Sequence, residues 1–507
     1  MTPLIAELER DPTRVVLHDR RGDLTAGQAL DTVRRLARAL ADLGHGPGRI
    51  AALVGPLSSR LHLAANAVEL TGGGQVEIPD TLPFTDQAGL ITECGAALAL
   101  ADPGAVRRTR LPDIAALPGV RLLALGPGPA GTDLLDTAAG LPAAPFPPRA
   151  RPGDPNRITL TGGTTGRAKP VLRRFRAGPP RTAPGVAELL AGDTPPRLLK
   201  TGRLTGLGRA LGDAAVAAGG QLITLPWFDP PEVAAVLAGQ RATHLVLSPY
   251  ELRLLLDHLD TSAAAPRFPH LRSVLSSTAA TSPALLSRAV ARFGPIVRPG
   301  YGQTEAGSVA RLEPADYADG SFDVRRSVGR PLPGVRVEVR DPRGRPREPG
   351  GRGEIWVHSP TLTTEYWKRP EATAHALRDG WLRTGDVGFL DRSGRLTVLG
   401  RAGEAMEVDG EAVFAGEVDP WLQEHPAVLE SATFDTPDGA GGTALRTAVV
   451  AAPGAAGNVG EPELRAWLAR RLDPRRVPAS VLFVPHIPLT YANEPCRDTL
   501  RKWFAAR

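Results

Sequence analysis

Lysine is nearly absent from this chain of 507 residues. It occurs only as Lys169, Lys200, Lys368 and Lys502, so arginine supplies most of the positive charge. These arginines stand singly among Asp and Glu, and the net charge of +6 therefore does not form the basic patch typical of nucleic-acid-binding proteins. None of the four lysines lies in a KxDG motif, the signature of polynucleotide ligases. We expect no nucleic-acid partner.

Cysteines and long apolar runs are also scarce. With only Cys94 and Cys496, the chain has neither a disulfide framework nor a CxxC metal pair, which fits a reducing compartment. The N-terminus does not open with a basic stretch followed by an apolar one, and apolar residues nowhere run unbroken for about twenty positions. We therefore expect a cytoplasmic protein with no membrane partner.

The composition is otherwise that of an ordinary globular protein. Hydrophobic residues make up 42% and charged residues 22% of the chain, which excludes wholesale disorder and fibrous repeats. The length is too great for one ordinary hydrophobic core, so at least two domains are expected.

The first part of the chain alternates between predicted helices and strands. Thr25 and Gln28 have the spacing of a capping box, an apolar helix face follows them, and Gly44 ends the helix. Short apolar runs typical of buried strands occur between helical stretches, at 50–54, 122–125, 158–160, 222–225 and 245–247. This alternation predicts an α/β fold with layered, largely parallel sheets.

The pattern changes near residue 400. Short strands, a helix near 463–472 and a final segment at 498–504 then predict a compact α+β unit. We expect domains at 1–400 and 401–507, a large layered N-terminal domain followed by a small mobile C-terminal domain. A proline-rich stretch at 142–155 is expected to be an extended connection that leads into the first glycine-rich motif.

The first motif directly follows the predicted strand at 158–160 and reads Thr161-Gly162-Gly163-Thr164-Thr165-Gly166-Arg167-Ala168-Lys169. Its glycines allow backbone N–H groups to converge, and its hydroxyls and lysine add donors and charge, which together suit a polyphosphate. The sequence is not the Walker motif GxxxxGK[ST], so a P-loop ATPase is disfavoured. Taken alone, the stretch could also be a flexible loop.

Two further motifs follow in order. Tyr301-Gly302-Gln303-Thr304-Glu305 offers a ring that can stack on a base, with oxygen ligands for phosphate and magnesium, although alone it could be a turn. Trp381-Leu382-Arg383-Thr384-Gly385-Asp386 places a carboxylate where it can accept hydrogen bonds from two ribose hydroxyls. Gly400-Arg401 then opens the C-terminal part.

The order of these motifs resembles the adenylate-forming superfamily, which includes acyl-CoA synthetases, nonribosomal-peptide adenylation domains and firefly luciferase. The resemblance covers nearly the whole chain, with further matches at Gly353-Glu354-Ile355, Tyr366-Trp367, Pro370-Glu371-Ala372-Thr373 and Pro488-Leu489-Thr490. It implies an enzyme that handles a carboxylic acid as an acyl-adenylate, with ATP and Mg²⁺, and passes it to a thiol, coenzyme A. The small domain would rotate between these two half-reactions.

The resemblance also implies individual roles. The ATP phosphates would be held by Thr161, Gly163, Thr164, Thr165, Gly166 and Lys169. The adenine would lie beside Ser277, Thr278 and Ala279, stacked on Tyr301 next to Gly302. Thr304 and Glu305 would serve phosphate and Mg²⁺, with Glu305 as the metal ligand. Asp386 would hold the ribose, and Arg401 would serve the nucleotide or the hinge.

One departure from the family pattern lies at the reacting centre. Where the family has a catalytic lysine after Pro-Leu-Thr, ungapped alignment places Glu494. A lysine would offset the negative charge of the approaching carboxylate and phosphate, a contribution of about 3 kcal/mol or more, whereas a carboxylate adds repulsion. The only lysine of the C-terminal part is Lys502. The alternative is a misaligned loop with an arginine, such as Arg497, as a stand-in.

Other departures are milder. Gly162 replaces a serine of the phosphate loop, which removes one hydroxyl donor. Gly403 replaces the usual hinge Asp or Lys, and a glycine still permits rotation of the backbone. Gly410 keeps the glycine of the loop that approaches the CoA pantetheine in the family. The departures at Glu494 and Gly162 thus weaken the ATP half-reaction, whereas the AMP-holding Tyr301 and Asp386 remain in place.

These features predict an acyl-CoA ligase that makes a thioester from an acyl-adenylate and CoA, with adenylation impaired or absent. The pattern resembles the non-adenylating acyl-CoA ligase of platensimycin and platencin biosynthesis, which implies a bulky terpenoid acid and a separate adenylating enzyme. A complete ATP-dependent acid–CoA ligase and a non-catalytic AMP-binding relic remain as alternatives. The stretch 199–207 has no Asp to hold an α-amino group, so an amino-acid substrate is disfavoured.

Overall fold

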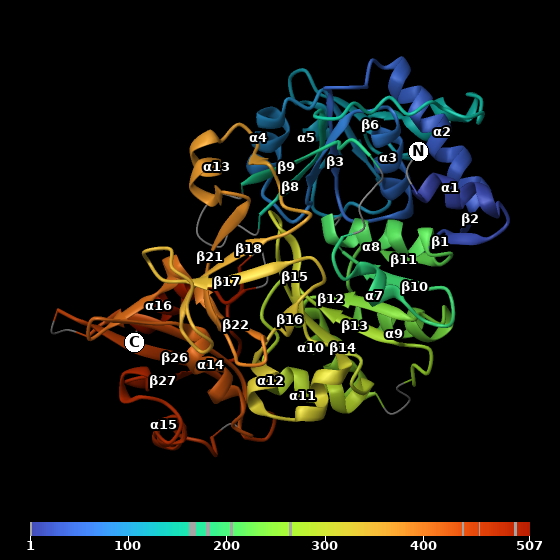
Figure 1. Ribbon diagram of the computed structural model, residues 1–507. Coiled ribbons are helices and arrows are strands. Elements are labelled where there is room, and N and C mark those ends of the chain that lie inside the picture. Colours follow the sequence, from blue (N-terminus) through green and yellow to red (C-terminus); the bar gives the residue numbers. More distant parts are fainter. Residues whose placement is uncertain are drawn as a thin grey trace.

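The large part of the molecule and a smaller C-terminal part are distinct in Figure 1. This computed structural model describes residues 3–161, 169–178, 183–202, 206–262, 266–438, 441–455, 457–490 and 494–506. The predicted α/β class, with a large N-terminal and a smaller C-terminal domain, is confirmed. A boundary at residue 400 remains a proposal, which fits the end of the last strand of the large part at Arg401.

One sheet carries the start of the phosphate motif. Its strand order is β19-β9-β8-β4-β3-β5-β6-β7, with β9 and β19 antiparallel to their neighbours and the other pairs parallel. Its strands are β3 (Ile50–Val54), β4 (Gly74–Ile78), β5 (Leu98–Ala101), β6 (Arg121–Ala124), β7 (Thr132–Asp133), β8 (Pro155–Leu160), β9 (Pro170–Arg174) and β19 (Glu365–Tyr366). The helices of this region are α1 (Pro3–Arg10), α2 (Ala26–Asp42), α3 (Ser59–Leu70), α4 (Phe84–Cys94), α5 (Leu111–Ala115) and α6 (Leu134–Ala139).

A second sheet carries the Tyr301 motif. Its order is β16-β15-β14-β13-β12-β10-β11-β1-β2. Its strands are β1 (Val15–Asp19), β2 (Gly22–Thr25), β10 (Arg197–Thr201), β11 (Gln221–Leu225), β12 (His244–Leu247), β13 (Ser273–Ser276), β14 (Val297–Gln303), β15 (Gly307–Arg311) and β16 (Arg330–Pro331). The helices are α7 (Val186–Leu190), α8 (Gly206–Ala217), α9 (Pro230–Gly239), α10 (Pro249–Thr261), α11 (Pro283–Phe293) and α12 (Phe322–Arg326), with the 3₁₀ turn η1 (Pro314–Asp319).

A third sheet carries Asp386 and leads into the C-terminal part. Its order is β17-β18-β21-β20, with β22 paired to β21. It comprises β17 (Arg336–Arg340), β18 (Gly353–His358), β20 (Leu377–Arg378), β21 (Trp381–Leu390) and β22 (Leu396–Arg401), with α13 (Pro370–Ala376) beside it. The C-terminal part has η2 (Ala402–Glu404), β23 (Met406–Val408), β24 (Glu411–Val413), α14 (Ala415–Gln423), β25 (Val428–Pro437), β26 (Thr443–Ala451), α15 (Glu461–Ala469), η3 (Pro474–Arg476), β27 (Ser480–Phe483) and α16 (Arg497–Ala505).

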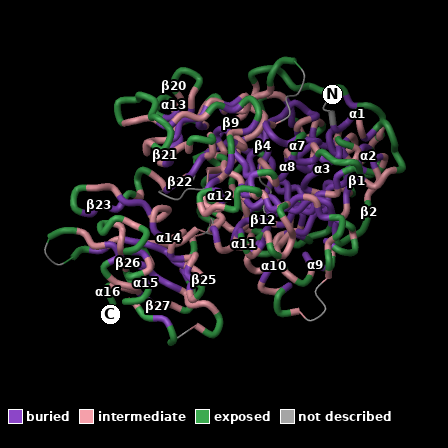
Figure 2. The backbone as a smooth tube through the Cα atoms, turned by 60° about the horizontal axis from the view of Figure 1, so that its bottom comes forward, coloured by how far each residue is buried: buried purple, intermediate pink, exposed green. Residues whose placement is uncertain are grey.

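The predicted local signals produce the expected elements. Thr25 caps α2 through the full capping box with Gln28, and the apolar stripe of α2 is buried. Nearly every residue of α3 is buried, because residues from both large sheets pack into one core around it. Figure 2 shows these buried segments gathered in the interior around α3 and α8. Each fully buried leucine there contributes about 1.5–3 kcal/mol.

The proline-rich stretch has the irregular structure that was expected of it. Residues 142–154, all of them described, contain no helix or strand, as their proline content predicts, whereas Pro155, the last residue of the expected connection, already begins β8. Across the described part of the chain, the helices are too short or too polar for any of them to span a lipid bilayer.

Candidate active site

Asp386 lies at the centre of a polar cluster formed by two sheets. Tyr301 and Gln303, from β14, donate to its carboxylate through the phenol at 2.5 Å and the side-chain amide at 2.6 Å. The β21–β22 register places Arg401 directly opposite Asp386, and their side chains pair at 3.0 Å. The structure thus brings together three residues that the sequence assigned to nucleotide binding, and adds Gln303.

The electrostatics of this cluster follow from its burial. Burial raises the pKa of the Asp386 carboxyl, although Arg401, Tyr301 and Gln303 oppose the rise. Burial, and then the Asp386 charge, raise the pKa of the Tyr301 phenol well above its usual range. Tyr301 is therefore a protonated donor at neutral pH, and the Asp386 carboxylate accepts from Tyr301 and Gln303 through one oxygen and pairs with Arg401 through the other.

The expected adenine side lies next to Tyr301. β13 and β14 are parallel neighbours, with Ser276 opposite Pro299, so the segment after β13 reaches the same edge as the Tyr301 motif. Thr278 has a φ of +83°, a left-handed conformation that normally favours glycine. Gly302 packs against β15, and a Cβ there would lie 2.5 Å from the Gly307 carbonyl oxygen. Ser277 and Ala279, on either side of Thr278, are half-buried.

The expected phosphate and metal side lies where the two large sheets meet. Thr161 and Lys169 close the base of the phosphate loop, since each backbone N–H of the pair donates to the other residue, at 3.0 and 2.9 Å. Gly162, Gly163, Thr164, Thr165 and Gly166 lie outside the described residues. The Thr304 hydroxyl donates to the Leu160 carbonyl at 3.2 Å, which holds the end of β14 against the start of this loop.

Glu305 has the environment expected of a magnesium ligand. The Tyr366 phenol donates to one of its carboxylate oxygens at 2.6 Å, and no donor among the described residues reaches the other. Nor do the described residues contain a cluster of three or more His, Cys, Asp or Glu side chains suited to a metal. Mg²⁺ is commonly held by one or two carboxylates together with substrate phosphates, so Glu305 fits that role.

The family models match both parts of this chain. The model described as AMP-binding enzyme matches residues 5–178 and 208–367. The model described as AMP-binding enzyme C-terminal domain matches residues 417–493. The chain belongs to the AMP-binding enzyme family.

Relatives from this family match nearly the whole chain. It is 33% identical to the structure of the amide bond synthetase McbA from Marinactinospora thermotolerans, with a TM-score of 0.87 and 99% of each chain covered. It is 26% identical to ATP-bound MatB from Rhodopseudomonas palustris, with a TM-score of 0.83 and 99% of each chain covered. It is 31% identical to the medium/long-chain-fatty-acid–CoA ligase FadD8 of Mycobacterium tuberculosis, over 99% of this chain and 89% of the relative. These matches support an AMP-forming acid–thiol ligase that uses ATP and CoA.

Glu494, at the expected lysine position of this family member, faces the Asp386 cluster. Its loop is closed by the Thr490 N–H, which donates to the Glu494 carbonyl at 2.7 Å. Burial, and then the nearby Glu404, raise the pKa of the Glu494 carboxyl, while Arg401 and Arg497 oppose the rise. Burial opposes the charge of Arg401, but Asp386, then Tyr301 and Glu494, raise the pKa of Arg401 above its usual value.

Arg497, the suggested stand-in for the lysine, is engaged within the C-terminal part. Its Nε donates to the Thr433 carbonyl at 3.0 Å, and its Nη1 pairs with Glu404 at 3.4 Å. These contacts direct the guanidinium toward its own domain. Arg401 is the other nearby arginine, and it is paired with Asp386.

The two glycines singled out in the hinge region differ in conformation. Gly403 lies in the 3₁₀ turn η2, and a Cβ there would meet no atom within 4 Å. Gly410 has a φ of +74° and follows Asp409, which has a φ of +48°, in the tight turn between β23 and β24. Positive φ at both central residues is the geometry that favours an Asp-Gly hairpin turn. The CoA role of Gly410 and the hinge role of Gly403 stay predictions.

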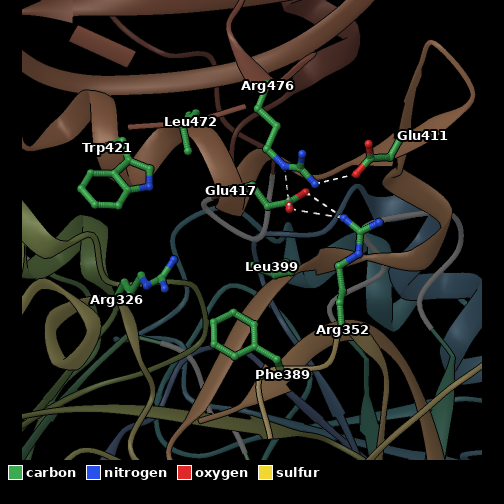
Figure 3. A pocket seen from close by; sticks show the side chains of 10 residues that line it. Arg326, Arg352, Phe389, Leu399, Glu411, Glu417, Trp421, Leu472 and Arg476 are labelled. Carbon is green, nitrogen blue, oxygen red and sulfur yellow. Dashed lines mark hydrogen bonds and ion pairs between the residues drawn. The ribbon is translucent and has the colours of Figure 1, made fainter. Parts of the chain in front are cut away.

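A second polar cluster joins the two parts of the molecule away from the nucleotide residues. In Figure 3, Arg352 and Arg476 both reach Glu417, with pairs at 3.3 and 3.1 Å, and Arg476 also pairs with Glu411 at 2.7 Å. These side chains line a cavity of about 440 Å³ together with Arg326, Gly350, Phe389, Leu399, Trp421 and Leu472. No residue predicted for nucleotide binding lines this cavity.

Further contacts cross between the same two parts. Arg325 pairs with Glu424 at 3.0 Å, and Arg253 pairs with Glu430 at 2.8 Å. Phe322 stacks on Trp421 with ring centroids 3.9 Å apart. These contacts hold the arrangement in which Glu494 faces the Asp386 cluster.

Sequence reasoning missed three contributors to the site. Gln303 donates to Asp386, Tyr366 donates to Glu305, and Arg173 binds the Thr304 carbonyl at 2.9 Å. Gln303 and Tyr366 belong to motifs that were recognised in the sequence, and this position could have identified both as site residues. Arg173 lies on β9 just after the phosphate loop, and nothing local marked it.

Proposed function

We propose that this protein transfers the acyl group of an acyl-adenylate to CoA, and that its own adenylation of the free acid is impaired. Glu494 carries the proposal, because it puts a carboxylate at the position of the family's catalytic lysine. The carboxylate lies within electrostatic range of both Arg401 and Asp386. A bulky terpenoid acid and a separate adenylating enzyme belong to the same proposal and rest on the resemblance in sequence.

A carboxylate at position 494 is expected to slow the adenylation half-reaction. During adenylation an anionic carboxylate approaches the α-phosphate, so a positive group lowers the barrier and a negative one raises it. Loss of one such electrostatic donor costs about 3 kcal/mol, or roughly a hundredfold in rate. Arg401 does not supply a free positive charge, because Asp386 pairs with it at 3.0 Å.

The thioester-forming half-reaction does not require a positive charge at position 494. A preformed acyl-adenylate has already lost pyrophosphate and has no free carboxylate. Thiol attack forms the thioester bond, breaks the bond from the acyl carbon to the phosphate oxygen, and releases AMP. Asp386, Tyr301 and Gln303 form a cluster suited to the AMP portion, and in the family this step follows rotation of the loop that carries Glu494.

Replacing Glu494 with lysine tests the proposal. Acid-dependent pyrophosphate release from ATP should be lowest in the wild type, higher in Glu494→Gln, and highest in Glu494→Lys, because the two changes first remove and then reverse the charge. Glu404→Gln serves as the control, since Glu404 is the neighbouring carboxylate that faces Glu494. Fast release by the wild type would favour a complete ATP-dependent ligase, and equally slow release by the wild type and Glu494→Lys would show that Glu494 is not the residue that limits adenylation.

A second candidate acceptor is an amine. The likeness to an amide bond synthetase, at 33% identity over 99% of both chains, favours it. The amine would attack the same acyl carbon and form an amide in place of a thioester. Supplying a synthetic acyl-adenylate with CoA, with a primary amine, or with both in competition would distinguish the two acceptors by the product formed.

A further inference from the structure

Arg173 connects the two sheets that form the nucleotide site. It lies on β9, immediately after the phosphate loop, and its guanidinium donates to the Thr304 carbonyl at 2.9 Å and to the Thr361 carbonyl. Thr304 belongs to the segment that follows β14 of the other large sheet. One side chain thus links the hairpin that carries the phosphate loop to the segment that carries Glu305.

Other contacts hold the same segment against β9. The Thr304 hydroxyl donates to the Leu160 carbonyl at the end of β8. The Thr363 N–H donates to the Glu305 carbonyl at 2.7 Å, and the Thr363 hydroxyl donates to the Leu172 carbonyl on β9. The backbone of Thr304 and Glu305 is therefore fixed from both sides, with Arg173 as its one cationic contact within the described residues.

The groups around Arg173 include some that oppose its positive charge and some that favour it. The strand register places it opposite Arg157, which pairs with Glu69 at 3.2 Å. Burial, and then the nearby Arg157, lower the pKa of Arg173 to about 10, while Glu305 and Glu77 oppose this. Arg173 is still charged at neutral pH, and its charge faces the carboxylate expected to hold Mg²⁺.

We propose that Arg173 is a positioning residue for the metal and phosphate side of the nucleotide site. Its hydrogen bond to the Thr304 carbonyl holds the Thr304–Glu305 segment against β9, the strand that follows the phosphate loop, so that Glu305 can meet a metal ion bound to the triphosphate. Tyr301 and Asp386, which face the adenosine portion, do not contact Arg173. The inference rests on the nucleotide site of the proposed function, but its test reads binding and not catalysis.

The test compares the affinities for MgATP and AMP by isothermal titration calorimetry. Arg173→Met keeps the length of the side chain and removes both donors, so MgATP should bind about tenfold more weakly while AMP changes by less than about twofold. Arg173→Lys keeps the charge and one donor, and should lose about threefold for MgATP. At fixed ATP, the Mg²⁺ concentration at half-saturation should rise in the same order.

Arg174→Met is the matched control, because the adjacent arginine binds the Gly153 carbonyl and Glu365 instead. It should leave both affinities unchanged. Equal losses for AMP and MgATP in Arg173→Met, accompanied by a lower Tm, would show a merely structural role and overturn the proposal. If Arg173→Met does not fold, the test rests on Arg173→Lys. An affinity of Arg173→Lys for MgATP equal to that of the wild type then overturns the proposal. Wild-type protein that binds AMP but not MgATP overturns it as well.

Discussion

Replacing Asp386 with alanine should weaken AMP binding at least tenfold. In the structure the Asp386 carboxylate is 6% exposed, and it accepts hydrogen bonds from Tyr301 and Gln303 while facing Arg401. On binding, the ribose hydroxyls must share this carboxylate with the donors already present. A hydrogen bond to a charged group contributes about 1.5–3 kcal/mol, and sharing reduces the net gain to about 1.4 kcal/mol or more, which is the tenfold effect.

The same change should lower the free energy of unfolding by about 2 kcal/mol, because it removes the charged acceptor of the Tyr301 phenol and one of the two acceptors of the Gln303 amide, which also donates to the Thr384 carbonyl. Arg401 adds little to this loss, since its side chain is 38% exposed and water can solvate it. Stability and affinity must therefore be measured separately, by chemical denaturation and by calorimetry with AMP.

Two variants separate the possible causes. Asp391→Ala removes a carboxylate that caps the turn after β21 through Ser393 and Arg395, so it should cost stability and leave AMP affinity unchanged. Tyr301→Phe removes one donor to Asp386 but keeps the ring, so it should change AMP affinity by less than about threefold. Equal AMP affinities for Asp386→Ala and Asp391→Ala would refute the ribose assignment.

Three further predictions concern pH, the hinge and the domain contacts. Because burial raises the pKa of Asp386, AMP affinity should fall as pH falls through that raised pKa, and Asp386→Asn should flatten the profile measured by calorimetry. The contribution of this carboxyl to folding stability changes with pH in the opposite direction to AMP affinity. It is fully present below the ordinary pKa of an aspartate and is lost as pH rises through the raised pKa of Asp386. Gly403→Pro should slow thioester formation while sparing AMP binding, in stopped-flow and binding assays, and equal transfer rates would exclude the hinge role. The double variant Arg325→Ala, Arg253→Ala removes two ion pairs between the large N-terminal part and the C-terminal part. Small-angle scattering should then show a changed domain arrangement, and the change should be larger at low salt. Scattering profiles identical to those of the wild type would contradict this prediction.

The elements of the fold were largely predictable from local signals. The Thr25–Gln28 capping box and the apolar run at 50–54 specify α2 and β3, because both features act within a few residues. The motifs also placed Tyr301, Asp386 and Arg401 in one site. Their pairing, however, depends on the β21–β22 register and on β14 approaching from another sheet, which no local pattern specifies.

The contacts around Glu305 could not be predicted from the sequence either, because they too come from strands that are distant in the chain. Tyr366 and Arg173 reach this segment from β19 and β9, across separations of 61 and 131 residues in the chain. Glu494 is the opposite case, since alignment to a family motif identified it and the structure added its charged neighbours. The departure of a single residue from a motif can be read from sequence, whereas the partners of that residue depend on tertiary packing.

The most direct test of the account is to measure the two half-reactions of the wild-type protein side by side. One reaction contains CoA and a panel of synthetic acyl-adenylates with fatty, aromatic and terpenoid acyl groups, and thioester is quantified. The other contains the corresponding free acids with ATP and Mg²⁺, and pyrophosphate release is quantified. The account predicts thioester from at least one acyl-adenylate, with pyrophosphate release from its free acid slower by about a hundredfold or more. Comparable rates for the two half-reactions, or no thioester from any acyl-adenylate that binds, would contradict it.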